Sequence, residues 1–214
     1  MAASARPRVG GGSPGDPGQE KMILAAVVPA AGFSSRMERE KILLPFGSST
    51  VLETVLETLA AAGIKEVVTV LRPDLPEAAE RASRAGARVI FNARPKEGML
   101  VSIRLGIEAV SSGAQAIFIW PADHPAVSRG TIRLLVRRAD PAYALVPCHR
   151  SRRGHPALIG RDLLETIMGI PPQEGLRHLW RMRPEALREI PVEDRGVVQN
   201  IDTPEDYRQV LEGS

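Results

Sequence analysis

The sequence predicts a three-layer α/β fold, in which helices cover both faces of a mainly parallel, doubly wound sheet. Short runs of aliphatic and β-branched residues alternate with longer segments whose apolar residues recur every three or four positions. Glycines follow three of these helical segments, where helices commonly end. Alternating strands and helices close as a parallel sheet covered on both faces, and 214 residues are enough for one such domain.

Five strands and four helices are expected in alternation. The strands are the runs of high β propensity at 23–28, 66–71, 87–91, 116–120 and 143–147. The helices lie between them, at 50–62, 74–85, 101–111 and 131–138. The glycines placed for a left-handed helix end are Gly63, Gly86 and Gly113. After residue 147 the alternation weakens: Val197 and Val198 form a short extended run, and a last helix follows residue 206.

Composition excludes several classes of protein. Residues 1–20 hold five glycines and three prolines without an apolar run, so we expect a flexible tail, with one folded domain at 21–214. The longest apolar run, 22–33, is well short of the roughly 20 residues of a membrane-spanning helix. The single cysteine, Cys148, favours the reducing cytoplasm, and a net charge of +3 is too small to indicate nucleic-acid binding.

The segment after the first strand is the first candidate site, because ligands bind such sheets beyond the carboxyl ends of the strands. This loop contains small residues, hydroxyls and cations in close succession: Ala30, Ala31, Gly32, Ser34, Ser35, Arg36 and Lys41. Consecutive backbone N–H groups with two cations form a cradle for a polyphosphate. The loop contains neither G-x-x-x-x-G-K-[ST] nor G-x-G-x-x-G, so a surface turn with solvated cations remains the alternative.

Five motifs occur in a fixed order along the chain. The first is P-A-A-G-F-S-S-R-M with K-I-L-L-P-F-G, and the others are E-G-M-L-V-S-I-R-L-G, P-A-D-H-P, R-R-G-H-P and N-I-D-T-P-E-D-Y. From about Ile23 to the C-terminus the chain resembles the nucleotidyltransferases of molybdenum-cofactor synthesis, and most of all the branch that transfers cytidylyl groups to molybdopterin. The resemblance implies a Rossmann-like sheet of the nucleotidyltransferase type.

Two positions depart from the family pattern. Glu38 stands where the family has a glycine after R-M, which adds a negative charge near the expected phosphates. Pro29 replaces the usual leucine, a feature shared with the cytidylyltransferases of isoprenoid synthesis. Transfer of CMP to methylerythritol phosphate is therefore the leading enzymatic alternative.

The resemblance implies transfer of CMP from CTP to molybdopterin in its molybdenum-loaded form, with Mg²⁺ and release of pyrophosphate. Lys41 and Arg36 match the family positions that grip the triphosphate, with Lys41 on phosphate oxygens in the transition state. Asp123 and Asp202 match the metal-binding acids. Asp202 or Thr203 is also placed to cap the last helix, and Asn200 is the alternative ligand.

The base and the acceptor have weaker candidates. Ala31 stands where the guanylyl branch of the family has a second glycine, so the resemblance implies that its methyl group narrows the base site and favours a pyrimidine. Gly98 and Ser102 match the stretch that meets the base edge, although Ser102 also suits an ordinary early-helix position. His155, with Arg152 and Arg153, matches the acceptor motif, against the alternatives of a packed histidine and solvated arginines.

The expected partners are CTP, a phosphorylated pterin acceptor and a molybdoenzyme that receives the finished cofactor, with no nucleic acid and no membrane. A non-catalytic protein that binds and delivers molybdopterin is the alternative from another functional class. All of these readings require that the cationic loop and the two acidic segments converge on one site.

Overall fold

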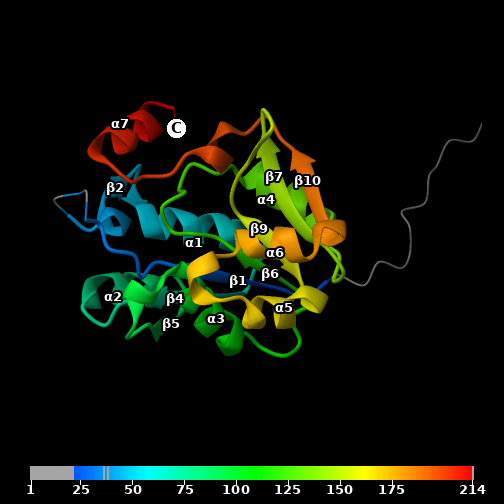
Figure 1. The fold of residues 1–214 in the computed structure, drawn as a ribbon. Coiled ribbons are helices and arrows are strands. Elements are labelled where there is room, and N and C mark those ends of the chain that lie inside the picture. The colour runs from blue at the N-terminus through cyan, green and yellow to red at the C-terminus, as the bar shows by residue number, and fades with distance from the viewer. Residues whose placement is uncertain (1–21, 36, 38, 214) are drawn as a thin grey trace, which may run out of the picture.

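The computed structural model describes residues 22–35, 37 and 39–213. Its main sheet has the strand order β10–β7–β9–β6–β1–β4–β5, and β8 pairs with β7 (Figure 1). The strands of this sheet are β1 (Leu24–Pro29), β4 (Glu66–Leu71), β5 (Arg88–Phe91), β6 (Ala116–Ile119), β7 (Ala144–His149), β8 (Arg152–Arg153), β9 (Ala157–Gly160) and β10 (Leu187–Pro191). The strands β6, β1, β4 and β5 are parallel neighbours, and β9 runs antiparallel between β6 and β7. The predicted fold class is confirmed.

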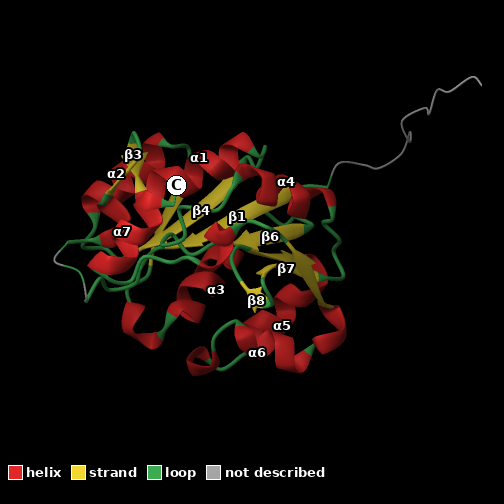
Figure 2. Cartoon of the chain, turned by 90° about the horizontal axis from the view of Figure 1, so that it is seen from above, coloured by secondary structure: helices red, strands yellow, loops and turns green. Residues whose placement is uncertain are grey.

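Helices cover both faces of the sheet, as Figure 2 shows from above. One face carries α1 (Val51–Ala61), α2 (Pro76–Arg84) and α4 (Arg129–Arg137), and the other carries α3 (Met99–Ala109), α5 (Leu164–Gly169) and α6 (Arg177–Met182). The last helix, α7 (Pro204–Glu212), packs beside the short hairpin β2 (Pro45–Phe46) and β3 (Ser49–Thr50).

The central strand β1 divides the core because its side chains alternate between the two faces. Ala26 and Val28 belong to the cluster under α1, α2 and α4, whereas Ala25 and Val27 belong to the cluster under α3, α5 and α6. All four side chains are fully buried. The sheet therefore forms a rigid floor whose carboxyl edge carries the loops after β1, β4 and β6.

The predicted strands and helices all occur, with boundaries shifted by a few residues at most. Gly63 and Gly86 have positive φ, each just past a helix, as expected. The prediction for Gly113 was wrong: α3 ends at Ala109, and Gly113 is not in a left-handed conformation. Residues 1–20 lie outside the described residues, so the tail and the domain boundary stay predictions.

The expected extended run at Val197 and Val198 was also wrong, because these residues belong to a 3-10 helix, η6 (Arg195–Val198). This turn fits tightly against its neighbours. A Cβ atom on Gly196 would lie 2.1 Å from the Ala126 carbonyl oxygen, and one on Gly154 would lie 2.2 Å from the Val197 carbonyl oxygen. Only glycine permits these close approaches, which hold the segment before Asp202 against the segment after β6 and against the turn between β8 and β9.

None of the helices in the described part of the chain has both the length and the apolar composition that crossing a lipid bilayer requires.

Candidate active site

Three charged side chains from distant parts of the sequence meet at the carboxyl edge of the sheet. Lys41 begins the 3-10 turn η1 (Lys41–Leu43), and its Nζ lies 2.6 Å from Asp123 Oδ2 and 2.9 Å from Asp202 Oδ1. Lys41 and Asp123 have side chains only 13% and 14% exposed, against 34% for Asp202. The structure thus brings together the cation and both acids that the sequence singled out.

The backbone fixes the two acids relative to each other. Asp123 follows β6 after Trp120 and Pro121, and the amide of Ile201 donates to the Asp123 carbonyl at 2.9 Å. The indole Nε1 of Trp120 donates to the His124 carbonyl at 3.1 Å, which holds the turn that carries Asp123. Asp202 is therefore positioned by a direct hydrogen bond between its own segment and that of Asp123.

Asp202 does not cap the last helix. Thr203 is the N-cap of α7, and it forms a capping box with Asp206. Asn200 Nδ2 donates to Asp202 Oδ2 at 2.8 Å, so the amide orients the carboxylate toward the site. Of the two alternatives, Asp202 is therefore the acid that faces Lys41, and Asn200 supports it.

The charges of this cluster stabilise one another. Burial alone would raise the pKa of Asp123, but a hydrogen bond from His124 Nδ1 at 2.9 Å and the charges of His124 and Lys41 outweigh it and hold that pKa well below its usual range. Burial would lower the pKa of Lys41, but Asp123 and Asp202 outweigh it and raise that pKa. Lys41 and Asp123 are consequently both charged at neutral pH.

The loop that precedes Lys41 contributes backbone and hydroxyl groups. Ser34 Oγ accepts a hydrogen bond from the Lys41 amide at 3.0 Å and donates to Glu40 Oε2 at 3.0 Å. Ala30 and Gly32 line a cavity of 350 Å³ together with Lys41 and both acids, which we call the carboxylate cavity. Buried Ala31 and exposed Ser35 are not part of its lining. Arg36 and Glu38 lie outside the described residues.

A second cavity of 580 Å³ adjoins the first, and we call it the adjoining cavity. The two share Met99, Pro121 and His155 in their walls. Its apolar lining comes from α3, from the strands β6 and β7 and from α6, and consists mainly of Met99, Leu100, Ile103, Ile119, Val146 and Trp180. Its cations are Lys96, Arg153 and Arg177. The site is therefore a double one, with a polar half beside an apolar half.

The remaining candidate residues, for the base and for the acceptor, do not all line the two cavities. Gly98 and Arg153 line the adjoining cavity, whereas Arg152 lines a separate polar hollow beside α7. Gly98 has φ of 105°, a conformation that favours glycine at the start of α3. Ser102 is buried and its Oγ accepts from Asn92 Nδ2 at 2.9 Å, so in this structure its hydroxyl is engaged inside the protein.

His155 stands at the junction of the two cavities. Its ring packs edge-on against that of His124, with centroids 4.7 Å apart, and its Nδ1 is buried without a hydrogen-bond partner among the described residues. Burial lowers the pKa of His155 to about 4. The electrostatic effect of His124 adds to this lowering, and the charge of Asp123 opposes it. The ring is therefore neutral at physiological pH and offers a hydrogen-bonding group without charge.

The donor set suits a divalent metal ion only in part. Within the described residues, no three His, Cys, Asp or Glu side chains are grouped as a metal site would require. Asp123 and Asp202 nevertheless converge on one cationic group, and carboxylate oxygens with substrate phosphates and water are the usual ligands of hard divalent cations. The residues present fit a metal ion that arrives with a phosphate ligand.

Sequence reasoning missed Arg72, which follows β4. It is 4% exposed and donates to the Gly32 carbonyl at 2.6 Å and to Glu40 at 2.5 Å. A lone arginine after a strand usually indicates a solvated side chain, and its partner Gly32 lies 40 residues away in the sequence.

Comparison with known proteins gives consistent results. Residues 26–190 match the MobA-like NTP transferase domain. The molybdenum cofactor cytidylyltransferase of Escherichia coli is 27% identical over 182 residues, which cover 85% of this chain and 92% of that protein. The nicotine blue oxidoreductase of Paenarthrobacter nicotinovorans is 30% identical over 197 residues, which cover 88% and 96%.

A solved structure adds to these relatives. The manganese complex of Rv0371C from Mycobacterium tuberculosis has a TM-score of 0.71 at 26% identity, over 90% of this chain and all of that one. The family match spans most of the chain and contains the loop after β1, Asp123 and the wall shared by the two cavities. The chain belongs to the family of MobA-like NTP transferases and is a nucleotidyltransferase.

Proposed function

We propose that this nucleotidyltransferase transfers CMP from CTP to a phosphorylated pterin, molybdopterin, with Mg²⁺ as its metal ion. An oxygen of the pterin phosphate attacks the α-phosphorus of CTP, the bond from that phosphorus to the bridging oxygen breaks, and pyrophosphate leaves. The observation that carries the proposal is the position of Lys41 Nζ between Asp123 and Asp202, in the cavity that shares a wall with the apolar one.

The carboxylate cavity has the charges that the reacting phosphates need. Asp123 and Asp202 would hold Mg²⁺ together with phosphate oxygens, and the ion when bound supplies positive charge to the triphosphate. Lys41 adds a second positive charge, and most of the catalysis in phosphoryl transfer is such positioning and neutralisation. A relative solved with manganese is in keeping with a divalent ion at these carboxylates.

The choice of CTP rests on the loop after β1. Ala31 is 3% exposed, and in this proposal the base lies beside it, where its methyl group would occupy space that a glycine would leave open. A pyrimidine fits the narrower site better than a purine does. We retain Arg36 on the triphosphate, and Gly98 and Ser102 beside the base, as parts of this proposal. The cytidylyltransferase from Escherichia coli is one of the relatives that support it.

The choice of acceptor rests on the adjoining cavity. Its apolar wall, with Trp180 at one side, suits a planar heterocycle, and Arg153 and Arg177 suit the acceptor phosphate. Methylerythritol phosphate is a small polyol without an apolar surface, and it would leave most of 580 Å³ unfilled. The geometry therefore favours the pterin, with His155 and Arg153 as acceptor-binding residues. Delivery of the product to a molybdoenzyme is part of the same proposal.

The proposal is tested by following pyrophosphate release with Mg²⁺ and each combination of CTP, GTP or UTP with molybdenum-loaded molybdopterin or methylerythritol phosphate. Of these combinations, we expect only CTP with the molybdenum-loaded pterin to release pyrophosphate. Asp123→Asn should lower kcat by about 100-fold or more, because it removes a carboxylate that would hold Mg²⁺ at the reacting phosphates. Asp162→Asn, at an exposed carboxylate, is the matched control and should leave kcat unchanged.

A clear preference for GTP would refute the assignment of the base, and turnover with the polyol would refute the acceptor. No turnover with either acceptor, with tight binding of molybdopterin, would show a delivery protein instead of an enzyme.

A further inference from the structure

Arg72 connects the rigid sheet to both ends of the loop at residues 30–41. It is the first residue after β4, and its guanidinium makes contacts in three directions. Nη1 donates to the Gly32 carbonyl at 2.6 Å, near the start of the loop, and Nη2 donates to Glu40 Oε1 at 2.5 Å, near its end. Nε donates to Asp74 Oδ1 at 3.0 Å, on its own segment.

The contact with Glu40 continues to the site. Glu40 Oε2 accepts from Ser34 Oγ at 3.0 Å, and the same Oγ accepts from the Lys41 amide at 3.0 Å. A continuous chain of hydrogen bonds therefore runs from Arg72 through Glu40 and Ser34 to the backbone of Lys41. The side chain of Lys41 then extends to Asp123 and Asp202.

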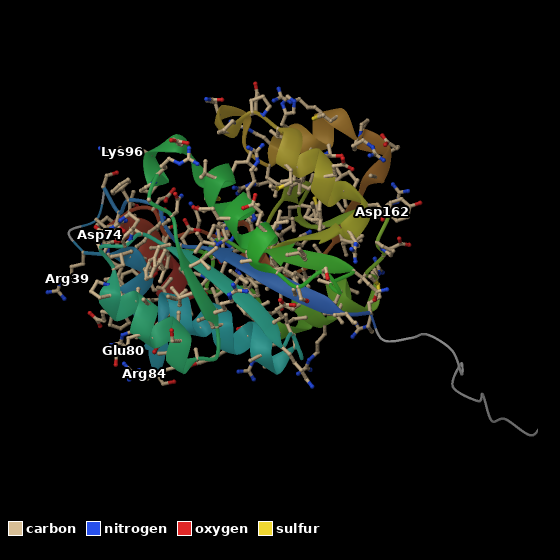
Figure 3. All side chains as sticks on the ribbon, turned by 90° about the horizontal axis from the view of Figure 1, so that it is seen from below. Arg39, Asp74, Glu80, Arg84, Lys96 and Asp162 are labelled. Atoms are coloured by element: carbon tan, nitrogen blue, oxygen red, sulfur yellow. The ribbon has the colours of Figure 1, made fainter. Side chains whose placement is uncertain are left out.

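The guanidinium is also covered. The ring of Phe33 lies over it, with 4.6 Å from Arg72 Cζ to the ring centroid, while Phe33 itself is 49% exposed. The Arg72 guanidinium is thus enclosed by the loop. The Phe33 ring covers one face, and the Gly32 carbonyl and the Glu40 carboxylate bind its edges. Figure 3 shows Asp74 and the loop residue Arg39 at the same end of the molecule.

We propose that Arg72 is a positioning residue, which holds the loop at 30–41 in the shape that presents Lys41 to the reacting phosphates. A planar fork with several donors can hold two loop ends and Asp74 at once, whereas a lysine ammonium cannot match that geometry. The inference rests on the proposed function in one respect, namely that the loop receives the triphosphate.

The first test measures the loop itself. Hydrogen exchange of a peptide spanning 30–41 should be faster in Arg72→Ala and in Arg72→Lys than in the wild type, with exchange of β1 and β4 unchanged. Arg81→Ala is the matched control, because Arg81 also pairs with two carboxylates, Glu53 and Glu77, but touches no loop residue in the described contacts. It should leave the exchange of 30–41 unchanged.

The second test measures turnover. Arg72→Ala should lower kcat with CTP by about 100-fold, the loss expected when a reacting group is misplaced by about 1 Å. The KM for the pterin should stay within a factor of about three, because the adjoining cavity contains no contact to Arg72. Arg72→Lys should fail to restore kcat, whereas a residue that acted by charge alone would be rescued by lysine.

If Arg72→Ala does not fold, Glu40→Gln removes the same ion pair at a less buried side chain and should give the same local increase in exchange. Unchanged exchange at 30–41 in these variants, or faster exchange spread over β1 and β4, would overturn the inference. If no acceptor supports transfer but the local exchange effect is seen, the proposed function fails and the positioning role stands.

Discussion

At the scale of single residues, Lys41 takes the place of a bound cation. The Lys41 ammonium lies within about 3 Å of both carboxylates and compensates one of their two negative charges. In the proposed reaction, a metal ion at Asp123 and Asp202 would require Nζ to move away first. The phosphates of the nucleotide offer the ammonium its alternative partner, so we expect the metal ion and the triphosphate to bind together.

Removal of the ammonium should therefore expose the metal site. We expect Lys41→Met to bind Mn²⁺ without nucleotide about tenfold more tightly than the wild type, because the two carboxylates lose their compensating charge. The free Mn²⁺ signal in electron paramagnetic resonance measures this affinity. Adding Asp123→Asn should abolish the gain. Equal Mn²⁺ affinity in the wild type and Lys41→Met would show that the ammonium does not compete with the metal ion.

His155 predicts how stability depends on pH. Burial lowers its pKa to about 4, while in the unfolded chain it is near 6.5. As pH falls from 6.5 to 4, the His155 ring takes up a proton in the unfolded chain but stays neutral in the folded chain. The free energy of unfolding therefore falls across this window. At pH 5 the loss is about 2 kcal/mol.

Urea denaturation of the wild type and of His155→Gln at pH 8 and pH 5 measures this loss. The wild type should lose about 2 kcal/mol more than the variant between the two values, because the glutamine has no proton to take up. The shared loss from all other groups cancels in the difference. Parallel losses in the two proteins would contradict the assignment of a neutral, buried ring.

At the scale of elements, α3 lies on β1 with almost no space between them. A Cβ atom on Gly106 would come within 2.2 Å of Val27 Cγ1, and Val27 is fully buried in the central strand. This close packing sets the height of α3 above the sheet. The first turn of the same helix, with Met99 and Leu100, then forms the wall of the adjoining cavity.

Gly106→Ala should destabilise the protein by about 1–3 kcal/mol, although alanine is the better helix former, because the methyl group overlaps Val27. Chemical denaturation measures the change. Gly130→Ala on α4, where the added Cβ meets only Ser128 Oγ at 3.6 Å, is the matched control and should be neutral or slightly stabilising. Val27→Ala in the same chain should relieve the clash, so strictly additive effects would contradict this reading.

Elements with a regular pattern could be predicted from the sequence, and those without it could not. The run Glu66–Leu71 has continuous β propensity and a helix on each side, and its bounds agree with the structure. β10 (Leu187–Pro191) mixes charged and apolar residues, and β9 (Ala157–Gly160) runs antiparallel to β6, outside the alternation of strands and helices. Their strands form because neighbours in the sheet supply the pairing, which no local pattern reveals.

At the scale of the whole molecule, the site joins segments that only the folded chain brings together. The roles of Lys41, Asp123 and Asp202 could be predicted because each lies in one of the ordered motifs that carry the family resemblance. The adjoining cavity could not, because one part of its wall comes from the weakly patterned segment at 172–180, which includes the start of α6. Arg104 on α3 binds the carbonyls of Ile167 and Ile170, just before that segment.

The wall shared by the two cavities has a kinetic consequence. Each substrate of the proposed reaction needs one hollow, whereas a molecule made by joining them extends past Met99, Pro121 and His155 and fills both. Such a conjugate makes the contacts of both cavities but loses translational and rotational entropy only once. Its residence time should exceed that of either parent, so inhibitors that bridge the wall would outlast those confined to one side.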